Sequence, residues 1–269
     1  MFDAMPHQRS IGLARIAFDG GRLTQLDQSG SAKAMLPRCH GPHPEIVFLN
    51  TSGGLTSGDR LGFQVRLGDG QRATATTQTA ERAYRADGPP ADARVDLEIG
   101  QGARLDWLPQ ETILFDGAAL TRQTTVNLRA DSEYLGIEII VLGRAAMGET
   151  VTRLRLLDRR TIRRDGRLLV MDPFRLDDAA LARGHGQALL GGMRAVAVLV
   201  LVCKAASDAL TPLREVLDEP GVNGAASARD GLLIARCMAP DAWPLRRQML
   251  RLIEKLRPGA LPRVWQNQE

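Results

Sequence analysis

The sequence predicts a mainly β fold of many short strands, with two α-helices in the last third of the chain. Glycine-containing turns recur at short intervals, apolar and charged residues alternate between several of them, and a helical period appears only after Ala206. The 269 residues are 44% hydrophobic but only 4% aromatic. We therefore expect a sizeable core that is mostly aliphatic.

Four short turns separate pairs of predicted strands in the first two thirds of the chain. They are centred on Gly20, Asp69, Gln101 and Asp165. Glycine supplies the positive φ angles that tight turns need, so each turn predicts a hairpin. The paired strands are expected at Ile11–Phe18 and Arg22–Leu26, Leu61–Leu67 and Gln71–Gln78, Arg94–Ile99 and Ala103–Leu108, and Val151–Arg163 and Arg167–Met171.

Other segments predict strands that lie deeper in the protein. Arg94–Ile99 alternates charged and apolar residues, which is typical of a strand with one wet face. Leu135–Leu142 and Ala195–Val202 are almost entirely apolar and short, so each predicts a strand buried on both faces. Glu45–Asn50 predicts a further strand, and the glycine-rich segment Gly53–Asp59 after it predicts a wide turn.

The helices are predicted from capping residues and apolar spacing. Asp208–Glu219 and Asp241–Leu256 both begin at a capping residue and end before a Pro-Gly pair, and the strand Gly231–Met238 separates them. The second helix is expected to bury the stripe Trp243, Met249, Leu250, Ile253 and Leu256. Its wet face is expected to be Arg246, Arg247, Arg251, Glu254 and Lys255.

We expect one domain over residues 1–269, with a β-rich part at 9–205 and a helix-containing part at 206–269. The sequence has neither a repeat of fixed period nor a low-complexity linker. The net charge is +4 and the isoelectric point about 9.3, carried mostly by arginine. A basic β-rich nucleic-acid-binding protein is therefore one alternative, although no aromatic residues alternate with the basic ones as in single-strand binders.

The location expected is cytoplasmic. Three cysteines without a CxxC pair favour a reducing compartment. Met1–Ser10 lacks the apolar core of a signal peptide, and the longest apolar run, Ala195–Cys203, is well short of the ~20 residues that span a bilayer. We expect no membrane partner.

Motifs of common enzymes are missing. The Gly53–Asp59 segment lacks the Gly-Lys-Ser/Thr ending of a P-loop, and the chain has no GxSxG or HExxH motif, so no catalytic residue is predicted. A thiol and two imidazoles at Cys39, His40 and His43 form one cluster suited to Ni²⁺, Cu²⁺ or Zn²⁺. Incidental histidines on a surface loop are the other interpretation. A metal-dependent hydrolase using this cluster is the second alternative.

Several carboxylates lie beside apolar or glycine-rich segments instead of in charged runs. Each is either paired with an arginine or functional. They are Asp59, Glu81, Glu111, Asp116, Glu149 and Asp172.

Five segments follow one another between Asn50 and Trp265. They are Asn50–Asp59, Thr77–Arg85, Trp107–Phe115, Leu142–Glu149 and Leu261–Trp265. In this order they resemble the UreD (UreH) family of urease accessory proteins. Within the third segment, Leu108–Phe115 (LPQETILF) is the most specific stretch.

The resemblance implies stacked sheets arranged somewhat like a β-helix. It also implies a non-enzymatic scaffold that binds urease apoprotein, UreF and the GTPase UreG, and indirectly UreE, during GTP-dependent nickel insertion into urease. No nucleic acid and no permanent cofactor are expected, only transient Ni²⁺. A plain structural subunit without a role in metal traffic is a third alternative.

Such a role would give the carboxylates a task. Ni²⁺ accepts oxygen ligands, and a conduit must release its ion, so dispersed carboxylates suit it better than a closed cage. Asp59 matches the Gly-Asp turn of the family and is the first candidate for a nickel path. Glu111, Glu149 and Asp172 follow.

Overall fold

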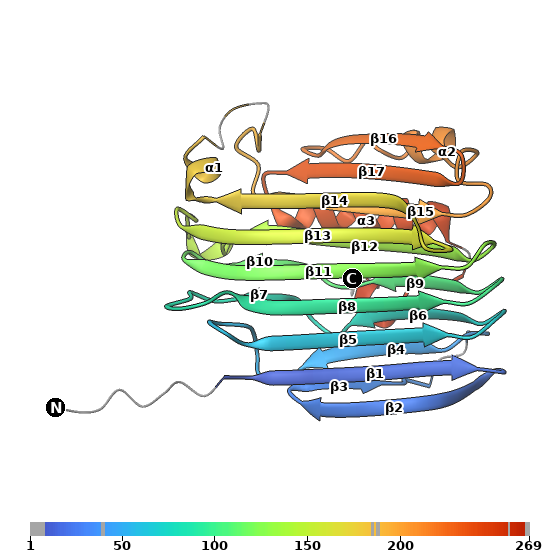
Figure 1. Cartoon of the computed structure of the whole chain (residues 1–269). Coiled ribbons are helices and arrows are strands. Elements are labelled where there is room, and N and C mark those ends of the chain that lie inside the picture. The colour runs from blue at the N-terminus through green and yellow to red at the C-terminus, as the bar shows by residue number, and fades with distance from the viewer. Residues whose placement is uncertain (1–8, 39–40, 184–185, 187–188, 258, 267–269) are drawn as a thin grey trace.

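Two β-sheets face each other in the computed structural model, which describes residues 9–38, 41–183, 186, 189–257 and 259–266. The strands are stacked from one end of the molecule to the other, largely in chain order (Figure 1). A seven-stranded sheet has the order β14-β13-β11-β8-β5-β1-β2, and a ten-stranded sheet has the order β16-β17-β15-β12-β9-β6-β4-β3, with β10 beside β12 and β7 beside β10.

The bounds of the strands are as follows. The seven-stranded sheet consists of β1 (Ile11–Asp19), β2 (Arg22–Gly30), β5 (Arg60–Leu67), β8 (Ala91–Ile99), β11 (Ala118–Leu128), β13 (Leu154–Arg164) and β14 (Arg167–Asp177). The ten-stranded sheet consists of β3 (Ala32–Met35), β4 (Glu45–Asn50), β6 (Arg72–Thr77), β7 (Glu81–Ala83), β9 (Arg104–Leu108), β10 (Thr112–Leu114), β12 (Glu133–Leu142), β15 (Ala195–Val202), β16 (Asn223–Arg229) and β17 (Leu232–Ala239).

From β4 to β13 the chain passes back and forth between the sheets, so that each coil stacks on the one before it. The stacked neighbours β5, β8, β11 and β13 are parallel, as are β4, β6, β9 and β12. This confirms the predicted stacked, β-helix-like arrangement. Arg60 lies beside Asp92, 32 positions on, whereas Ala118 lies beside Leu154, 36 positions on. Coils of unequal length explain why the sequence has no fixed repeat.

Two of the four predicted hairpins are wrong. The turns at Gly20 and Asp165 do join antiparallel neighbours, β1 with β2 and β13 with β14. The turns at Asp69 and Gln101 instead lead from the seven-stranded sheet to the ten-stranded one. Gly70 and Gly102 have the positive φ values of 66° and 62° that were expected. Local turn chemistry is the same in both cases, and only long-range pairing decides which sheet the next strand joins.

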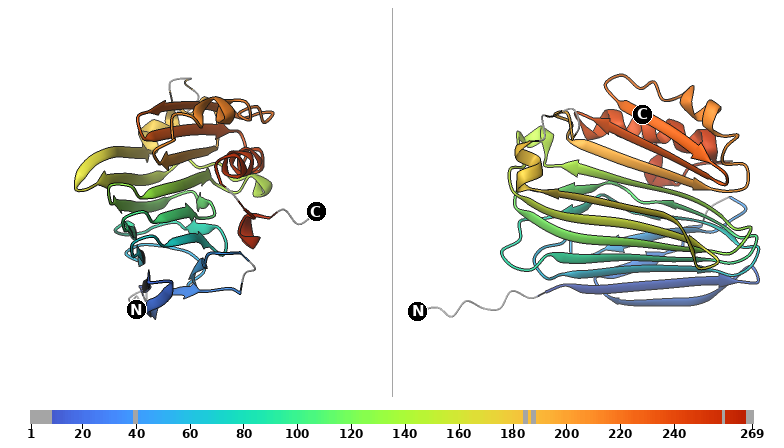
Figure 2. Two further views of the ribbon diagram at one scale, coloured as in Figure 1. Left: turned by 90° about the vertical axis from the view of Figure 1, so that its right-hand side faces the viewer. Right: turned by 45° about the horizontal axis from the view of Figure 1, so that its top comes forward.

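The ten-stranded sheet has a core on each face. Its inner face packs on the other sheet through residues such as Phe48, Leu105 and Trp107. Its outer face packs under α3 (Ala242–Leu256), which Figure 2 shows outside the sheet layers. β12 and β15 are buried along almost their whole length, as the apolar runs predicted.

The helices agree with the prediction in part. Asp241 caps α3 through a bond from the Trp243 amide of 3.2 Å. Trp243 itself is 55% exposed, and Leu245 and Leu252 are buried in its place. The first predicted helix, Asp208–Glu219, is shorter in the structure, where α2 spans Leu210–Arg214. After α2, the amides of Val216 and Leu217 donate to the carbonyl groups three residues earlier, which is the hydrogen-bond pattern of a 3₁₀ turn. The remaining helical elements are α1 (Asp178–Ala182), which was not predicted, and the 3₁₀ turns η1 (Ala145–Met147) and η2 (Arg263–Trp265). No helix in the described ranges has both the length and the apolar character needed to cross a membrane.

Candidate functional site

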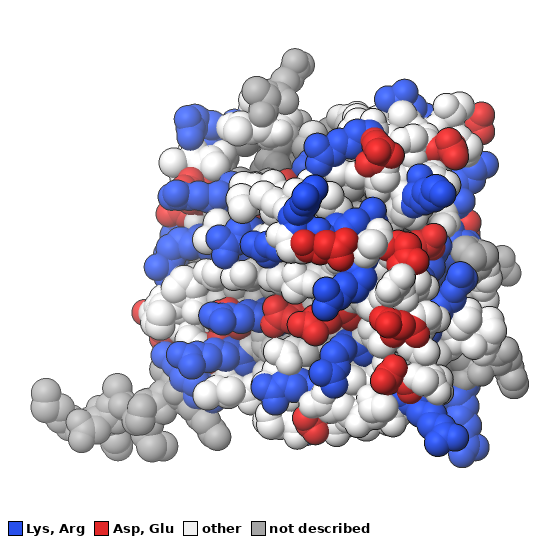
Figure 3. Space-filling view, turned by 45° about the vertical axis from the view of Figure 1, so that its right-hand side comes forward, with Lys and Arg blue, Asp and Glu red and all other residues white. Residues whose placement is uncertain are grey.

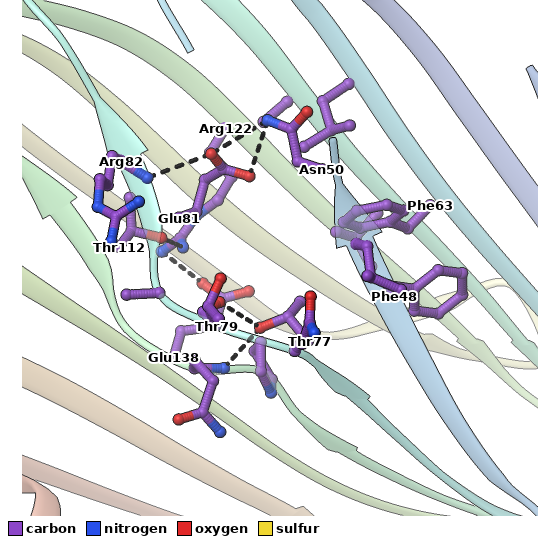
Figure 4. A pocket seen from close by; sticks show the side chains of 18 of the residues that line it. Phe48, Asn50, Phe63, Thr77, Thr79, Glu81, Arg82, Thr112, Arg122 and Glu138 are labelled. Atoms are coloured by element: carbon purple, nitrogen blue, oxygen red, sulfur yellow. Dashed lines mark hydrogen bonds and ion pairs between the residues drawn. The ribbon is translucent and has the colours of Figure 1, made fainter. Parts of the chain in front are cut away.

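A small cavity of about 100 Å³ lies between the two sheets. It opens where β4, β6 and β9 end and the chain turns toward β7 and β10. One wall is aromatic, because the Phe48 ring stacks on Phe63 at 4.6 Å and contacts Trp107 edge-on at 6.0 Å between centroids. Figure 4 shows the polar side chains that share this space. They include Asn50, Thr77, Thr79, Glu81, Gln110, Thr112, Arg122 and Glu138.

Glu81 is the carboxyl group nearest the mouth of the cavity. It faces Asn50, whose Nδ2 donates to Oε1 and Oε2, each at 3.2 Å (Figure 4). The Arg82 amide donates to Oε1, also at 3.2 Å. Burial raises the pKa of Glu81 to about 7, although the Asn50 and Arg82 contacts oppose that rise. Near neutral pH this group therefore exists in both protonation states, with the Asn50 amide nitrogen beside it.

Glu138 marks the inner end of the cavity and ties the two sheets together. It lies on β12, and its Oε2 pairs with Arg122 Nη2 at 3.0 Å and Arg160 Nη1 at 2.8 Å, both from the other sheet. Thr124 Oγ1 donates to its Oε1 at 2.6 Å. Asp158 is fully buried beneath both arginines, at 2.8 Å from Arg122 and 2.9 Å from Arg160. The network is thus closely packed and its charges are mutually compensated.

The protonation of this network is fixed by its partners. Burial alone would raise the pKa of Asp158, but Arg122 and Arg160 lower it below the ordinary value. Burial alone would lower the pKa of Arg122, yet Asp158 and Glu138 raise it. Asp158 and Arg122 therefore stay charged throughout the physiological range.

The network continues into a second, larger cavity of about 530 Å³. Asp172 lies there on β14, between Arg160 Nε at 3.2 Å and Arg236 Nη2 at 2.8 Å. Glu138 lines both cavities. Polar groups therefore follow one another through the interior from Glu81 to Asp172, by way of Glu138.

Two buried donors along the first cavity have no partner among the described residues. They are Trp107 Nε1 and Gln110 Nε2. The exposed fractions of the two residues are 2% and 8%. A buried N–H group without an acceptor is costly, so this end of the cavity suits a polar occupant with acceptor oxygens.

The predicted carboxylates are placed apart from one another. Asp59 is buried and accepts the Ser10 amide at 2.7 Å and the Thr56 amide at 2.8 Å, so both of its oxygens hold backbone. Glu149 accepts the Arg144 amide and side chain at 3.0 and 2.9 Å, and the pKa of Glu149 is lowered chiefly by Arg144. Glu111 lies 3.4 Å from Arg246. In the described part of the chain, no three His, Cys, Asp or Glu side chains are grouped to hold a metal ion.

The first three segments singled out in the sequence line the first cavity, and the other two contact the third of them. Asn50 contacts Glu81, Tyr84 packs edge-on against Phe115 at 4.9 Å, and the Arg144 guanidinium lies 4.4 Å from the centre of that ring. From the fifth segment, Trp265 Nε1 donates to the Leu108 carbonyl at 2.7 Å. Segments as far as 157 positions apart are thus neighbours in space.

Comparison with known proteins agrees with this arrangement. The family model described as UreD urease accessory protein matches residues 11–266. The chain is 56% identical over 269 residues to the urease accessory protein UreD of Paracoccus denitrificans, covering 99% of this chain and 96% of that protein. The chain belongs to the UreD urease accessory protein family. It is also 58% identical over 257 residues to the UreD of Cereibacter sphaeroides (96% and 93% covered) and 44% identical over 263 residues to that of Rhizobium leguminosarum bv. viciae (96% of each).

In this UreD family member, the Cys39–His43 cluster falls partly outside the described residues. Cys39 and His40 are the two members that lie outside the described residues. His43 is exposed and lines a groove with Arg72 and Arg257, away from the cavity that holds Glu81.

Sequence reasoning selected Asp172 but passed over the residues that join it to the cavity. Glu138 carried a usable signal, because it is the lone carboxylate within the apolar run Leu135–Leu142. A charge in a strand buried on both faces must be paired or functional. Arg122 and Arg160 had no such signal, since each lies among other polar residues on its strand. Glu81 was among the carboxylates noted, but nothing local distinguished it from Asp116.

Proposed function

We propose that this chain acts as a non-catalytic scaffold in urease maturation. In this role it binds urease apoprotein together with UreF and the GTPase UreG, and it assists GTP-dependent insertion of nickel that UreE supplies. The observation that carries the proposal is that three of the five UreD-like segments line one internal cavity, while the other two pack against the third segment. Segments that mark a family of accessory proteins are expected to lie together where the shared function is carried out.

Nickel would be cargo here, held only in passing. The carboxyl oxygens of Glu81 are ligands that Ni²⁺ accepts, whereas the Asn50 amide directs its Nδ2 to Glu81 and its Oδ1 to Ser52. Glu138 and Asp172 offer further carboxylates along the interior, but their arginine partners compete for the same oxygens. Carboxylates that bind the ion weakly, because arginines compete for the same oxygens, suit an ion that must be released to the next site. The predicted path carboxylates Asp59, Glu111 and Glu149 line neither of the two cavities, so we place the path through Glu81.

The cargo role of Glu81 is tested by Glu81→Gln in cells that co-express urease and its accessory proteins. We expect this variant to co-purify with urease as wild type does, but to leave urease with less nickel and lower activity. Glu98→Gln is the matched control, because Glu98 is an exposed carboxylate on the outer face of β8. Normal nickel content with Glu81→Gln would remove Glu81 from the path.

The alternative functions find less support. Figure 3 shows acidic and basic side chains interleaved over the face in view, without the single-signed field that tracks a nucleic-acid backbone. For the hydrolase alternative, His43 lies apart from the buried carboxyl groups of the cavity, and its two companions fall outside the described residues. Ester or phosphate hydrolysis lost on mutating Cys39, His40 and His43 would revive it.

A further inference from the structure

A basic groove of about 560 Å³ lies where the segment after α3 folds back over the ten-stranded sheet. Its walls come from the segment after β3, the first residues of β6 and β9, and the C-terminal segment that includes η2. Five arginines line it. They are Arg38, Arg72, Arg104, Arg257 and Arg263.

The two inner arginines are fixed in the structure. Asp106 lies between them, with Oδ1 at 3.0 Å from Arg104 Nε and Oδ2 at 2.9 Å from Arg257 Nε. Arg104 also pairs with Glu133 at 3.1 Å, and Arg257 Nη2 donates to Thr74 Oγ1 at 2.8 Å. The floor of the groove is therefore rigid, and its charges are balanced within it.

The three outer arginines differ from the inner pair. The side chains of Arg38, Arg72 and Arg263 are exposed and make no hydrogen bond or ion pair anywhere in the described structure. Both carboxylates of the groove, Asp106 and Glu45, already have interactions of their own. Three like charges therefore share one rim without a counter-charge, which favours an anionic ligand.

The size of the groove favours a ligand with several anionic groups. At about 560 Å³, it has room for far more than one carboxylate. The unpaired arginines also come from three separate segments, so positive charge is contributed by several walls of the groove. Guanidinium groups pair with carboxylates through two parallel hydrogen bonds.

We propose that this groove binds an acidic segment of a protein partner, whose Asp and Glu side chains pair with Arg38, Arg72 and Arg263. This proposal rests on the proposed scaffold role in one respect, because that role supplies a protein partner for the groove. It places partner binding on a different part of the molecule from the cavity that holds Glu81.

A labelled hexaglutamate peptide is the probe, titrated against the full-length chain by fluorescence anisotropy at increasing NaCl. We expect binding that weakens with salt, and a loss of about tenfold or more in the triple variant Arg38→Glu, Arg72→Glu, Arg263→Glu. The matched control reverses three exposed arginines without side-chain partners on the seven-stranded sheet, Arg60, Arg66 and Arg167. This control should bind as wild type does.

Circular dichroism checks that both triple variants are folded, and a milder triple Arg→Gln variant of the groove should also bind more weakly. Equal peptide binding by the groove and control variants would overturn the proposal. So would tighter binding of inorganic phosphate than of the peptide, since the site would then select phosphate. Urease activation by the wild-type chain is scored separately, so the scaffold role can stand when this test fails.

Discussion

Burial of the Glu81 carboxyl group favours its neutral form. Burial dominates over the hydrogen bonds from Asn50 and Arg82, and the pKa of Glu81 rises to about 7 from an ordinary 4.5. Between pH 4.5 and about 7, the Glu81 carboxyl group is mostly deprotonated in the unfolded chain but mostly protonated in the folded chain. The folded state then binds more protons, so stability falls as pH rises through this window.

Glu81→Gln should remove this pH dependence. We expect the variant to be more stable than wild type at pH 8, by about 3 kcal/mol, and about equally stable near pH 4.5. The glutamine keeps a carbonyl oxygen for Asn50 and carries no charge to desolvate. Urea denaturation at pH 5, 6, 7 and 8 measures the effect. Parallel stability profiles for the two proteins would show that the fold does not perturb Glu81.

Residues were predictable from the sequence where their neighbours in the chain define their environment. Asp241 was identified as a cap because the helix that it begins follows it directly. Asp59 was noted as a carboxylate, but its partner, the Ser10 amide, is 49 positions away. The same applies to Glu138, whose arginine partners come from the opposite sheet. A pairing across two sheets leaves no local pattern in the sequence.

Among the elements, α3 and the segment after it attach the C-terminal end to the sheet. Arg246 was expected on the wet face of α3, but it donates to Gln110 at 2.6 Å and lies 4.4 Å from the centre of the Trp265 ring. Trp265 is fully buried and bonds to the Leu108 carbonyl. Two family-like segments are thereby joined through one tryptophan.

Trp265→Phe should lower the free energy of unfolding by about 1–2 kcal/mol, because the buried hydrogen bond to Leu108 is lost while most of the apolar contact remains. Thermal unfolding measures the change. Trp243→Phe provides the control, since that side chain is 55% exposed and its replacement should cost less than about 0.5 kcal/mol. Equal effects of the two substitutions would contradict the anchoring role of Trp265.

The positions of most strands could be predicted, but their partners could not. Alternation and apolar runs located β8, β12 and β15 to within a few residues. The short strands β7 and β10 were missed, since three residues carry too little pattern. The turns at Asp69 and Gln101 lead into β6 and β9. Which sheet these two strands join depends on contacts with the neighbouring coils, and the residues of the turns do not determine those contacts.

For the molecule as a whole, the buried ion network is the polar link between the sheets. Arg122 joins Asp158 within its own sheet to Glu138 in the other, and it is almost fully enclosed. Arg122→Met should destabilise the fold by about 3–5 kcal/mol, because Asp158 and Glu138 lose a counter-charge while they remain buried. Chemical denaturation measures this cost.

A double variant separates the lost charge from lost packing. Adding Asp158→Asn to Arg122→Met removes one of the stranded charges, so part of the stability should return. If the double variant were no more stable than Arg122→Met alone, the network would act through packing and not through charge.

The central claim is that this chain is required to mature urease. The most direct test co-expresses the urease structural subunits and the other accessory proteins with and without this chain, and measures urease activity and nickel per purified urease. We expect low activity and low nickel content without the chain, both restored when it is supplied, and co-purification of the chain with urease apoprotein. Full activity and full nickel content in its absence would contradict the account.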